Sequence, residues 1–401
     1  MTASSTASSP SPSSGSTWQI LGYVYFTFIC YLSIGLPLAV LPAYVHLTMG
    51  YSALVAGLVI SIQSIATLAS RPWAGHISDR IGAKVSVLWG MAACTGSGVL
   101  LLAAGFLEHR RALGLTVLIA SRLVLGAGES LGSTGSMLWG ITSAGHEHTA
   151  KVISYNGIST YGAQALGAPL GVLLAAAWGL PLLGLVIVLL GAGSFVLASR
   201  KQPAPVMHGE HLLFPHLLRR VAPHGMGLAL GGVGYGVLAT FITLFYVSRH
   251  WSGAALCLTA FGLAFIVARL LFIQTIGVYG GFPVSLVSLT VESMGLILLW
   301  RAPSPWTALG GAALAGFGFS LVFPALGVEA VRRVPVHNRG TALGVYTAFA
   351  DVSFFLVGPV AGAVIDGFGY ASVFLFGLAC VAAALVIVAV LTAAERRISS
   401  A

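Results

Sequence analysis

The stretch AGHISDRIGAK, residues 74–84, carries Asp79, Arg80 and Lys84 between two long apolar runs. Charge is rare elsewhere, because Asp, Glu, Lys and Arg make up only 7% of the chain, against about a quarter in soluble proteins. Apolar residues make up 57%, and the mean hydropathy is +0.95. Such a chain cannot cover a water-facing surface. The sequence therefore predicts a membrane protein in which residues 74–84 form a loop between two spans.

The apolar runs predict an all-α membrane protein with twelve transmembrane helices in two halves of six. A helix needs roughly 20 apolar residues to cross the hydrocarbon core of a bilayer. The predicted spans are 18–47, 53–75, 85–106, 115–143, 152–178, 181–198, 226–247, 254–275, 284–300, 306–331, 341–365 and 371–391. The predicted domains are a disordered tail at 1–17, an N-terminal bundle at 18–199, a cytoplasmic linker at 200–225, a C-terminal bundle at 226–393 and a tail at 394–401.

Basic residues predict the orientation of these spans. With the N-terminus in the cytoplasm, the inner loops and tail hold Arg80, Lys84, Lys151, Arg200, Lys201, Arg219, Arg220, Arg332, Arg333, Arg339, Arg396 and Arg397. The outer loops hold only Arg110, Arg111, Arg249 and Arg301. This asymmetry follows the positive-inside rule. It predicts cytoplasmic termini in a bacterial inner membrane, and it accounts for the net charge of +9 without a nucleic-acid partner.

Several function classes lack their sequence signatures. The four cysteines lie in apolar spans without a CxxC pattern, and the histidines of the linker match no compact metal-ligand spacing. A GxxxxGK[ST] motif for ATP and an HExxH metalloprotease motif are both missing from the sequence. No compact Ser/His/Asp arrangement lies at one depth. We therefore expect no metal, no cofactor and no enzymatic activity.

The two halves resemble one another at an offset of 190 positions. GAGESL at residues 126–131 matches GFGFSL at residues 316–321, and Pro169 in GAPLG corresponds to Pro359 in VGPVAG. This weak internal repeat supports a protein built from two related six-helix units. Secondary transporters are commonly built in this way.

The motif GHISDRIGAK resembles the loop motif of the major facilitator superfamily, Gly-x-x-x-Asp-Arg-x-Gly-Arg/Lys-Lys/Arg, between its second and third helices. Gly75, Asp79, Arg80, Gly82 and Lys84 match, and Ala83 replaces a usual basic residue. The resemblance covers the whole membrane region and implies a transporter that works by alternating access, commonly as a monomer in membrane lipid. More closely, residues 70–84, 128–131 and 323–344 resemble bacterial carriers of the YfcJ/YhhS type, a group assigned to efflux.

In the family that the motif resembles, this loop latches onto the start of the eleventh helix, here near Gly340 and Thr341. Physically, Gly75 and Gly82 allow a close-packed turn, and Asp79 can accept charge-assisted hydrogen bonds. The alternative is that the charges only fix the topology, which explains the basic residues but not Asp79. The corresponding loop of the second half, IGVYGGFP at residues 276–283, has no charge, so the gate is not expected to be symmetric.

Ionisable residues inside the spans are the main candidates for a proton site, because each is costly in a membrane. Asp351 and Glu129 are the proton-coupling candidates, since removal from water favours a protonated carboxyl group and a nearby arginine opposes it. The alternatives are structural: Asp351 paired with Arg269, or Glu129 paired with Arg122 two turns away on the same helix. Arg122 also resembles the coupling arginine of the superfamily's RxxxGxG segment. Glu292 is interpreted as structural.

Substrate and helix-packing candidates complete the predicted site. Arg269 is predicted either to bind an anionic substrate or to pair structurally, and polar or aromatic residues of several helices are predicted to line a cavity: Tyr31, Asn156, Tyr161, Gln164, Tyr235 and Tyr346. GAQALGAPLG, residues 162–171, resembles a Gly/Pro-rich motif of antiporters. There Gly167, Pro169 and Gly171 suit a hinge, a seal between the halves or ordinary packing, as do Gly358 and Pro359 in the second half.

Together these features predict a secondary active transporter for a small organic compound. Proton-coupled efflux by antiport is the favoured mechanism, and a proton symporter or facilitator that imports a metabolite is the alternative. The sequence cannot separate the two directions, because the same buried acids serve both cycles.

Overall fold

The computed structural model describes residues 17–107, 110–145, 148–204, 214–332, 334 and 339–399. This part of the chain is helical throughout and contains no strand. The N-terminal half consists of α1 (Thr17–Leu38), α2 (Leu41–Ala43), η1 (Tyr44–Thr48), α3 (Ala53–Ile77), η2 (Ser78–Gly82), α4 (Ala83–Gly105), α5 (Arg111–Ala144) and α6 (Thr149–Arg200). The C-terminal half consists of α7 (Phe214–Ser248), α8 (Ala254–Phe272), α9 (Thr275–Tyr279), α10 (Gly281–Trp300), α11 (Pro305–Phe319), α12 (Val322–Arg332), α13 (Arg339–Phe368) and α14 (Ser372–Ser399).

The described residues contain ten helical segments that are long and apolar enough to cross a membrane. Two of them, Ala53–Gly105 and Lys151–Arg200, have 53 and 50 residues. As straight helices they would extend about 75–80 Å, more than twice the roughly 30 Å hydrocarbon core. The first is interrupted at Gly82, where φ is 124°, and the second at Trp178 and Gly179, where the backbone leaves the helical region. Division at both breaks is compatible with the twelve predicted spans.

The chain reverses direction at the break in α6. Near its start, the Lys151 ammonium donates a hydrogen bond of 2.8 Å to the Thr17 hydroxyl. Past its end, the Lys201 ammonium lies 3.0 Å from the position that a Cβ on Gly22 would occupy. Both ends of α6 therefore lie beside the first residues of α1, as two antiparallel spans require.

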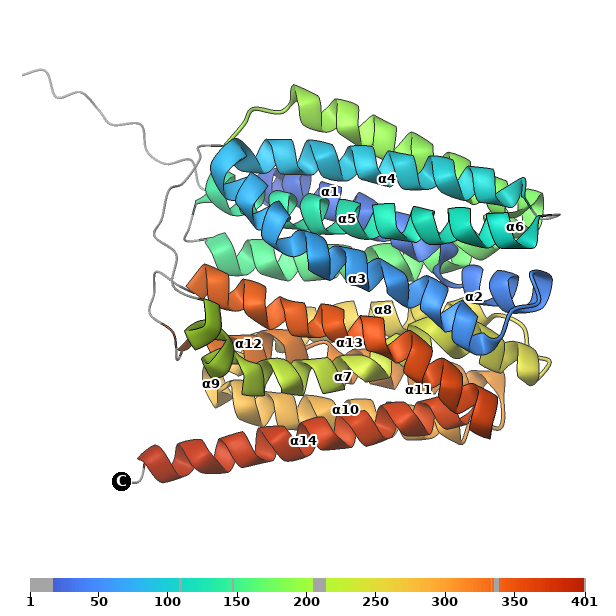
Figure 1. Cartoon of the computed structure of the whole chain (residues 1–401). Coiled ribbons are helices and arrows are strands. Elements are labelled where there is room, and N and C mark those ends of the chain that lie inside the picture. The colour runs from blue at the N-terminus through green and yellow to red at the C-terminus, as the bar shows by residue number, and fades with distance from the viewer. Residues whose placement is uncertain are drawn as a thin grey trace, which may run out of the picture.

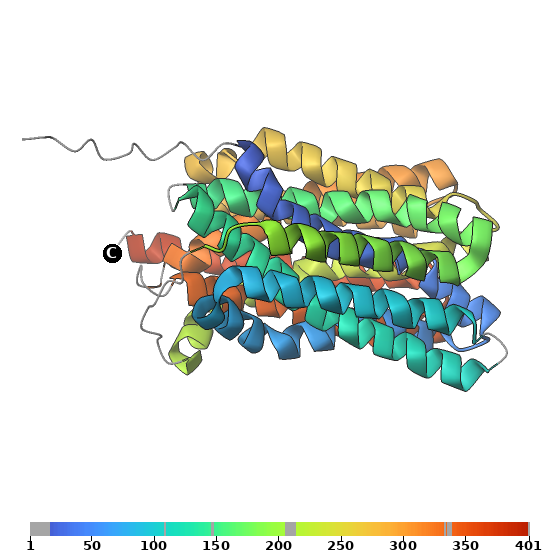
Figure 2. The same cartoon turned by 90° about the horizontal axis from the view of Figure 1, so that it is seen from above.

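The two halves lie side by side with their helices along a common long axis (Figures 1 and 2). We call the end where α1 begins and α14 finishes the terminal end, and the other the opposite end; the terminal end is on the left of Figure 1. The halves meet mainly where α3 packs against α13 and where α6 packs against α8. These two helix pairs position the side chains of the candidate site.

Exposed aromatic residues lie near both ends of the bundle. Trp18 and Trp73 are exposed near the terminal end, and Trp178 and Phe368 are exposed at the opposite end. Trp and Tyr are enriched where a membrane meets water. Exposed Leu and Val side chains lie between these levels, for instance on α8 at Leu263, Val267 and Leu270. This pattern is typical of a helical bundle surrounded by lipid.

The predicted span 306–331 matches one segment of membrane-spanning length, Pro305–Ala330, within which α11 ends at Phe319 and α12 begins at Val322. Pro324 explains the break: it lacks the backbone N–H that would bond the Ser320 carbonyl in a continuous helix. Two predicted boundaries also differ. α7 begins at Phe214, inside the interval predicted as a linker, and α14 continues to Ser399, into the predicted tail.

Candidate functional site

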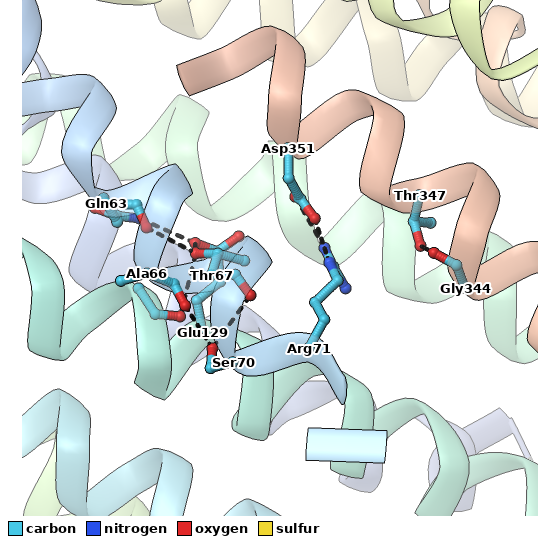
Figure 3. Close-up of polar contacts among 10 residues, drawn as sticks. Gln63, Ala66, Thr67, Ser70, Arg71, Glu129, Gly344, Thr347 and Asp351 are labelled. Atoms are coloured by element: carbon cyan, nitrogen blue, oxygen red, sulfur yellow. Dashed lines mark hydrogen bonds and ion pairs between the residues drawn. The ribbon is translucent and has the colours of Figure 1, made fainter. Parts of the chain in front are cut away.

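An ion pair joins the two halves at α3 and α13. The Arg71 guanidinium donates through Nε and Nη2 to the two carboxylate oxygens of Asp351, the second bond being 3.0 Å long. The Arg71 side chain is 23% exposed and the Asp351 side chain 8% exposed. Figure 3 shows the arginine pointing from α3 toward the carboxylate on α13. Two parallel bonds hold both the distance and the orientation of the pair.

Glu129 on α5 lies close to this pair. Its Oε2 accepts hydrogen bonds from Gln63 Nε2 at 3.0 Å and from Thr67 Oγ1 at 3.1 Å, both on α3 (Figure 3). The carboxylate also interacts electrostatically with Arg71 and Asp351. We call Arg71, Glu129 and Asp351 the charged cluster. One cation therefore faces two acids, one from each half of the protein.

The structure corrects two alternatives for the predicted acids. Asp351 pairs with Arg71 and not with Arg269, because Arg269 lies on α8 and donates to the Ser320 carbonyl. Glu129 pairs with side chains of α3 and not with Arg122, although both residues lie on α5. Arg122 is buried inside the N-terminal half beside Ser121 at 3.5 Å, with its Nε unpartnered. A role of Arg122 in coupling stays a prediction.

Arg71 is the residue that the sequence analysis missed as a site residue. It lies one position before Pro72 near the end of a predicted span, so it resembles an ordinary charge at a membrane surface. Its length lets its guanidinium reach Asp351 across the interface between the halves. Its position in an apolar segment is the one sequence signal for Arg71, and Arg122 and Arg269 share it, so this signal does not single out Arg71.

Tyr31, Gln164 and Tyr235 lie near the contact between the halves. Tyr31 on α1 lies close enough to Glu129, Arg71 and Asp351 to interact with all three. The Tyr235 hydroxyl on α7 donates a hydrogen bond to Gln164 Oε1 on α6. A direct contact with a substrate stays a prediction for all three residues.

Tyr161 belongs to a group of six rings that we call the aromatic cluster: Tyr161, Tyr235, Phe261, Phe265, Phe319 and Phe354. The Tyr161 ring on α6 lies 3.9 Å from that of Phe265 on α8 and 5.4 Å from that of Tyr235 on α7, between centroids. Phe319 and Phe354 lie about the Tyr235 ring, at 6.2 and 5.9 Å. The cluster therefore joins one helix of the N-terminal half to four of the C-terminal half.

Two predicted cavity residues pack inside a single half instead. The Asn156 side-chain oxygen on α6 accepts a hydrogen bond of 2.7 Å from Thr27 on α1. Tyr346 is fully buried in the C-terminal half, and its hydroxyl donates to the Phe323 carbonyl at 2.9 Å. The Asn156 oxygen and the Tyr346 hydroxyl are thus bonded within their own halves, and this placement does not support a cavity role. A pocket of about 210 Å³ lined by Val172, Thr243, Tyr246 and Trp251 contains none of the predicted residues.

The residues of the loop motif, Gly75 to Lys84, differ in what they contact. Lys84 donates through Nζ to the carbonyls of Ser199 and Lys201, each at 2.7 Å, so it holds the end of α6. Gly82 needs its positive φ of 124°. The expected close packing at Gly75 is wrong, because a Cβ there would meet nothing within 4 Å. Arg80 is exposed. The burial and side-chain contacts at residues 340 and 341 are outside what the structure describes, so the Asp79 latch stays a prediction.

Lys201, just beyond the last turn of α6, also faces the N-terminal half. Its ammonium lies 4.5 Å from the centre of the Tyr23 ring on α1. Partial burial lowers the pKa of this ammonium below its ordinary value. The end of α6 is therefore held both by Lys84 and by the side chain of Lys201.

The two Gly/Pro-rich segments seal different interfaces. A Cβ on Gly171 would lie 1.7 Å from the Leu36 carbonyl oxygen, and one on Gly167 would lie 2.8 Å from the Gly35 carbonyl carbon. Gly167 and Gly171 therefore pack α6 on α1 within the N-terminal half. Ala165 of the same segment faces α8 of the other half, where its carbonyl accepts a hydrogen bond of 2.7 Å from Thr259, so a role as a seal between the halves stays a prediction. Gly358, next to Pro359, does meet the other half: a Cβ there would lie 2.3 Å from the Gly57 carbonyl oxygen.

Further contacts join the halves toward the opposite end. The Gly358 N–H donates to the Ser61 hydroxyl at 3.0 Å, and the His46 ring contacts the Tyr370 hydroxyl at 3.1 Å. Thr243 donates to the Ala39 carbonyl at 3.0 Å. Small residues allow this close approach of helices in a membrane. The backbones of the two halves therefore meet directly at this level.

Comparisons with known proteins agree with this architecture. The family model described as Major Facilitator Superfamily matches residues 24–281 and 225–400. The chain is 53% identical over 401 residues to an uncharacterized MFS-type transporter of Burkholderia pseudomallei (strain 1106a), covering 100% of this chain and 98% of the relative. It is 56% identical over 366 residues to one of Pseudomonas aeruginosa (strain LESB58), covering 91% and 90%.

Two solved structures share the fold. The human organic anion transporter MFSD10 (TETRAN) aligns with a TM-score of 0.71 at 15% identity, covering 92% of this chain and 98% of that one. A D-xylose-proton symporter aligns with a TM-score of 0.72 at 18% identity, covering 92% and 97%. Helices of membrane-spanning length, two packed halves and these matches lead to one conclusion. The chain is a multi-pass membrane transport protein that belongs to the Major Facilitator Superfamily.

Proposed function

We propose that this transporter exports a small organic compound across the bacterial inner membrane in exchange for protons, with both termini in the cytoplasm. The charged cluster is the observation that carries this proposal. An ion pair between the halves holds them together while Asp351 is ionised, and it weakens when Asp351 takes up a proton. Proton binding is thereby linked to the separation of α3 from α13.

Glu129 is a second acid with which the Arg71 guanidinium can pair. When Asp351 is protonated, the Arg71 guanidinium loses its partner and is attracted to the nearby Glu129 carboxylate. When Glu129 is protonated instead, Arg71 returns to Asp351. One arginine shared by two acids on different halves thus couples the occupancy of a proton to the arrangement of the halves. Such a bistable contact is what alternating access requires.

The contact between Gly57 and Gly358 supports a conformation that is closed at the opposite end. With the termini in the cytoplasm, this end faces the outside, so substrate from the cytoplasm enters when the halves separate at the terminal end. In the proposed cycle, substrate binds from this side, and the Asp79 loop then closes the terminal end. Entry of a proton from outside resets the charged cluster for the next cycle.

Import by symport uses the same cluster and differs only in the order of binding. Everted membrane vesicles that contain the protein and hold an acidic lumen separate the two directions. Addition of an exported compound should release protons from the lumen, followed with a pH-sensitive dye. Glu129→Gln and Asp351→Asn should abolish this release, and Asp366→Asn, an exposed acid on the same helix as Asp351, should keep it.

Other outcomes of this experiment contradict the proposal in different ways. Equilibration of the substrate across the membrane without proton movement would establish a facilitator and remove proton coupling. Movement of protons and compound in the same direction would establish a symporter. Proton release that persists in both acid variants would exclude the charged cluster as the coupling site.

A further inference from the structure

Arg269 on α8 is a buried cation without an acidic partner in the described part of the chain. Its side chain donates through Nη2 to the Ser320 carbonyl, and the guanidinium lies 4.8 Å from the centre of the Phe265 ring. Its Nε has no hydrogen-bond partner, and the residue is only 3% exposed. An arginine keeps its charge in proteins. A charge that is buried in this way is costly unless an anion compensates it.

The hydrogen bond from Arg269 to the Ser320 carbonyl does not explain this charge. The Ser320 carbonyl is free because Pro324 cannot donate to it, so any donor would satisfy it, including a neutral one. A carbonyl supplies only a dipole, whereas a guanidinium has five N–H donors arranged to match a carboxylate. Within the described residues, the N–H donors of the Arg269 guanidinium are therefore only partly hydrogen-bonded.

Glu292, a buried acid of the same half, does not supply the missing charge. Glu292 on α10 is fully buried, and both of its carboxylate oxygens lack a hydrogen-bond partner. Its Oε1 points toward α7, where it lies 2.4 Å from the position of a Cβ on Gly234. It makes no ion pair with Arg269, although both interact with Tyr161. The charge of Arg269 is thus not neutralised by Glu292.

Arg269 lies where the halves meet. Its Nη1 is 2.6 Å from the position of a Cβ on Gly157 of α6, so the N-terminal half covers it. The break between α11 and α12 lies beside it, because Ser320 also donates through its hydroxyl to the Phe265 carbonyl at 2.7 Å. Interrupted helices at the interface of the two repeats are typical places for substrate binding in transporters. Separation of α6 from α8 would open this side of Arg269.

We propose that Arg269 binds the anionic group of the transported compound and that the aromatic cluster holds its apolar part. The substrate class is therefore an organic anion, such as a carboxylate with an aromatic or apolar body. This inference rests on the proposed transport function and names the substrate for it. The anion pairs with the free edge of the guanidinium, and the rings of Tyr161, Phe265 and Phe319 pack against the body.

Binding of matched probes to the purified full-length protein tests the inference without requiring transport. The probes are benzoate and phenylacetate, each paired with its neutral amide of the same shape, at a pH where both acids are ionised. The acids should raise the unfolding temperature and the amides should not, because a ligand stabilises only the state that binds it. Titration calorimetry gives the corresponding affinities.

Variants then assign the binding to one residue. Arg269→Gln should weaken benzoate binding by roughly tenfold or more, as expected for loss of a charge-assisted pair. Arg269→Lys should keep part of the affinity, since it keeps the charge without the fork. Arg301→Gln removes an exposed arginine that stacks on Trp300 and should leave the affinity unchanged.

If acids and amides raise the unfolding temperature equally, or if neither raises it, the inference is overturned. This comparison needs only the wild-type protein, so it holds even if Arg269→Gln does not fold. Unchanged benzoate affinity in Arg269→Gln would also overturn it. The vesicle experiment distinguishes this failure from that of the proposed function. Proton-coupled export restricted to neutral or cationic compounds would refute the anion site and keep antiport, whereas acid binding without proton movement would keep the site and refute coupling.

Discussion

Arg71 on α3 and Asp351 on α13 form a bidentate ion pair that joins the two halves of the protein across 280 positions of sequence. Glu129 lies close to both partners on a third helix. The pair is therefore placed where a change in protonation alters the contact between the halves. The following predictions test what each part of this arrangement does.

Loss of one partner of the pair should destabilise the protein. Asp351→Asn or Arg71→Gln leaves a largely buried charge without its partner, which costs about 3–5 kcal/mol at a fully buried site and less here, since Arg71 is 23% exposed. The double variant removes both charges and should recover much of this stability. Thermal unfolding of the purified variants measures the effect. Additive losses in the double variant would show that the two residues are not energetically coupled.

The same set of variants should show that protein stability and proton-coupled transport can be lost independently. The double variant Arg71→Gln/Asp351→Asn should fold and yet lose proton-dependent transport, because no ion pair remains between α3 and α13 for a proton to break. Asp366→Asn serves as the control on α13, since Asp366 is exposed. Proton-coupled transport by a well-folded double variant would rule out the charged cluster as the coupling element.

Glu129→Gln should keep the fold and change the pH dependence of transport. The neutral amide retains an oxygen that accepts from Gln63 and Thr67, so the contacts between α3 and α5 survive. The group can no longer take up or release a proton, so the transport rate should lose the pH dependence that Glu129 contributes. Rates measured between about pH 5 and 9 test this, and an unaltered pH profile would assign Glu129 a purely structural role.

Gly358→Ala should force the halves apart at the opposite end. The added Cβ would lie 2.3 Å from the Gly57 carbonyl oxygen, and overpacking of this kind costs about 1–3 kcal/mol. The conformation closed at this end should lose population, so a cysteine placed near it should react faster with an impermeant thiol reagent. Gly367→Ala is the matched control on the same helix, because a Cβ there meets nothing within 4 Å. Equal labelling in both variants would argue against a seal at Gly358.

Substitution of Lys84 should affect stability, whereas substitution of Asp79 should affect transport. Lys84→Met removes two hydrogen bonds to the end of α6 and should lower the stability by about 1 kcal/mol. Asp79→Asn should leave insertion and stability near those of the wild type but change transport or the balance between inward and outward labelling. Wild-type transport with unchanged labelling in Asp79→Asn would remove the latch role.

Much of the fold could be predicted from local sequence properties. Runs of about 20 apolar residues indicate spans because a bilayer satisfies no backbone polar group, so each segment must form its own hydrogen bonds as a helix. The turn at Gly82 was also visible in the motif, since only glycine adopts its φ of 124° readily. Pro324 frees the Ser320 carbonyl at the break between α11 and α12, but proline alone does not predict a break, because Pro72 and Pro359 lie inside continuous helices.

The sequence predicted the acidic residues of the candidate site but not the arginine that pairs with them. Asp351 and Glu129 stand out because charge is rare inside apolar segments. The arginine that faces them could not be selected from the sequence, because Arg71, Arg122 and Arg269 all lie within or near the ends of spans. Their roles differ only through what each side chain meets: Asp351 for Arg71, Ser121 for Arg122 and the Ser320 carbonyl for Arg269.

The two Gly/Pro-rich segments show the same division between sequence and tertiary structure. Their small residues predicted close helix contacts, and both segments make them. Which helix each one meets was not encoded locally: Gly171 packs on Leu36 within one half, whereas Gly358 packs on Gly57 across the halves. The sequence by itself determined the helices, their turns and the scarcity of charge, because the membrane acts on each segment separately. Only the tertiary structure decided which charges pair and where the halves touch, because these contacts depend on the packing of helices far apart in the chain.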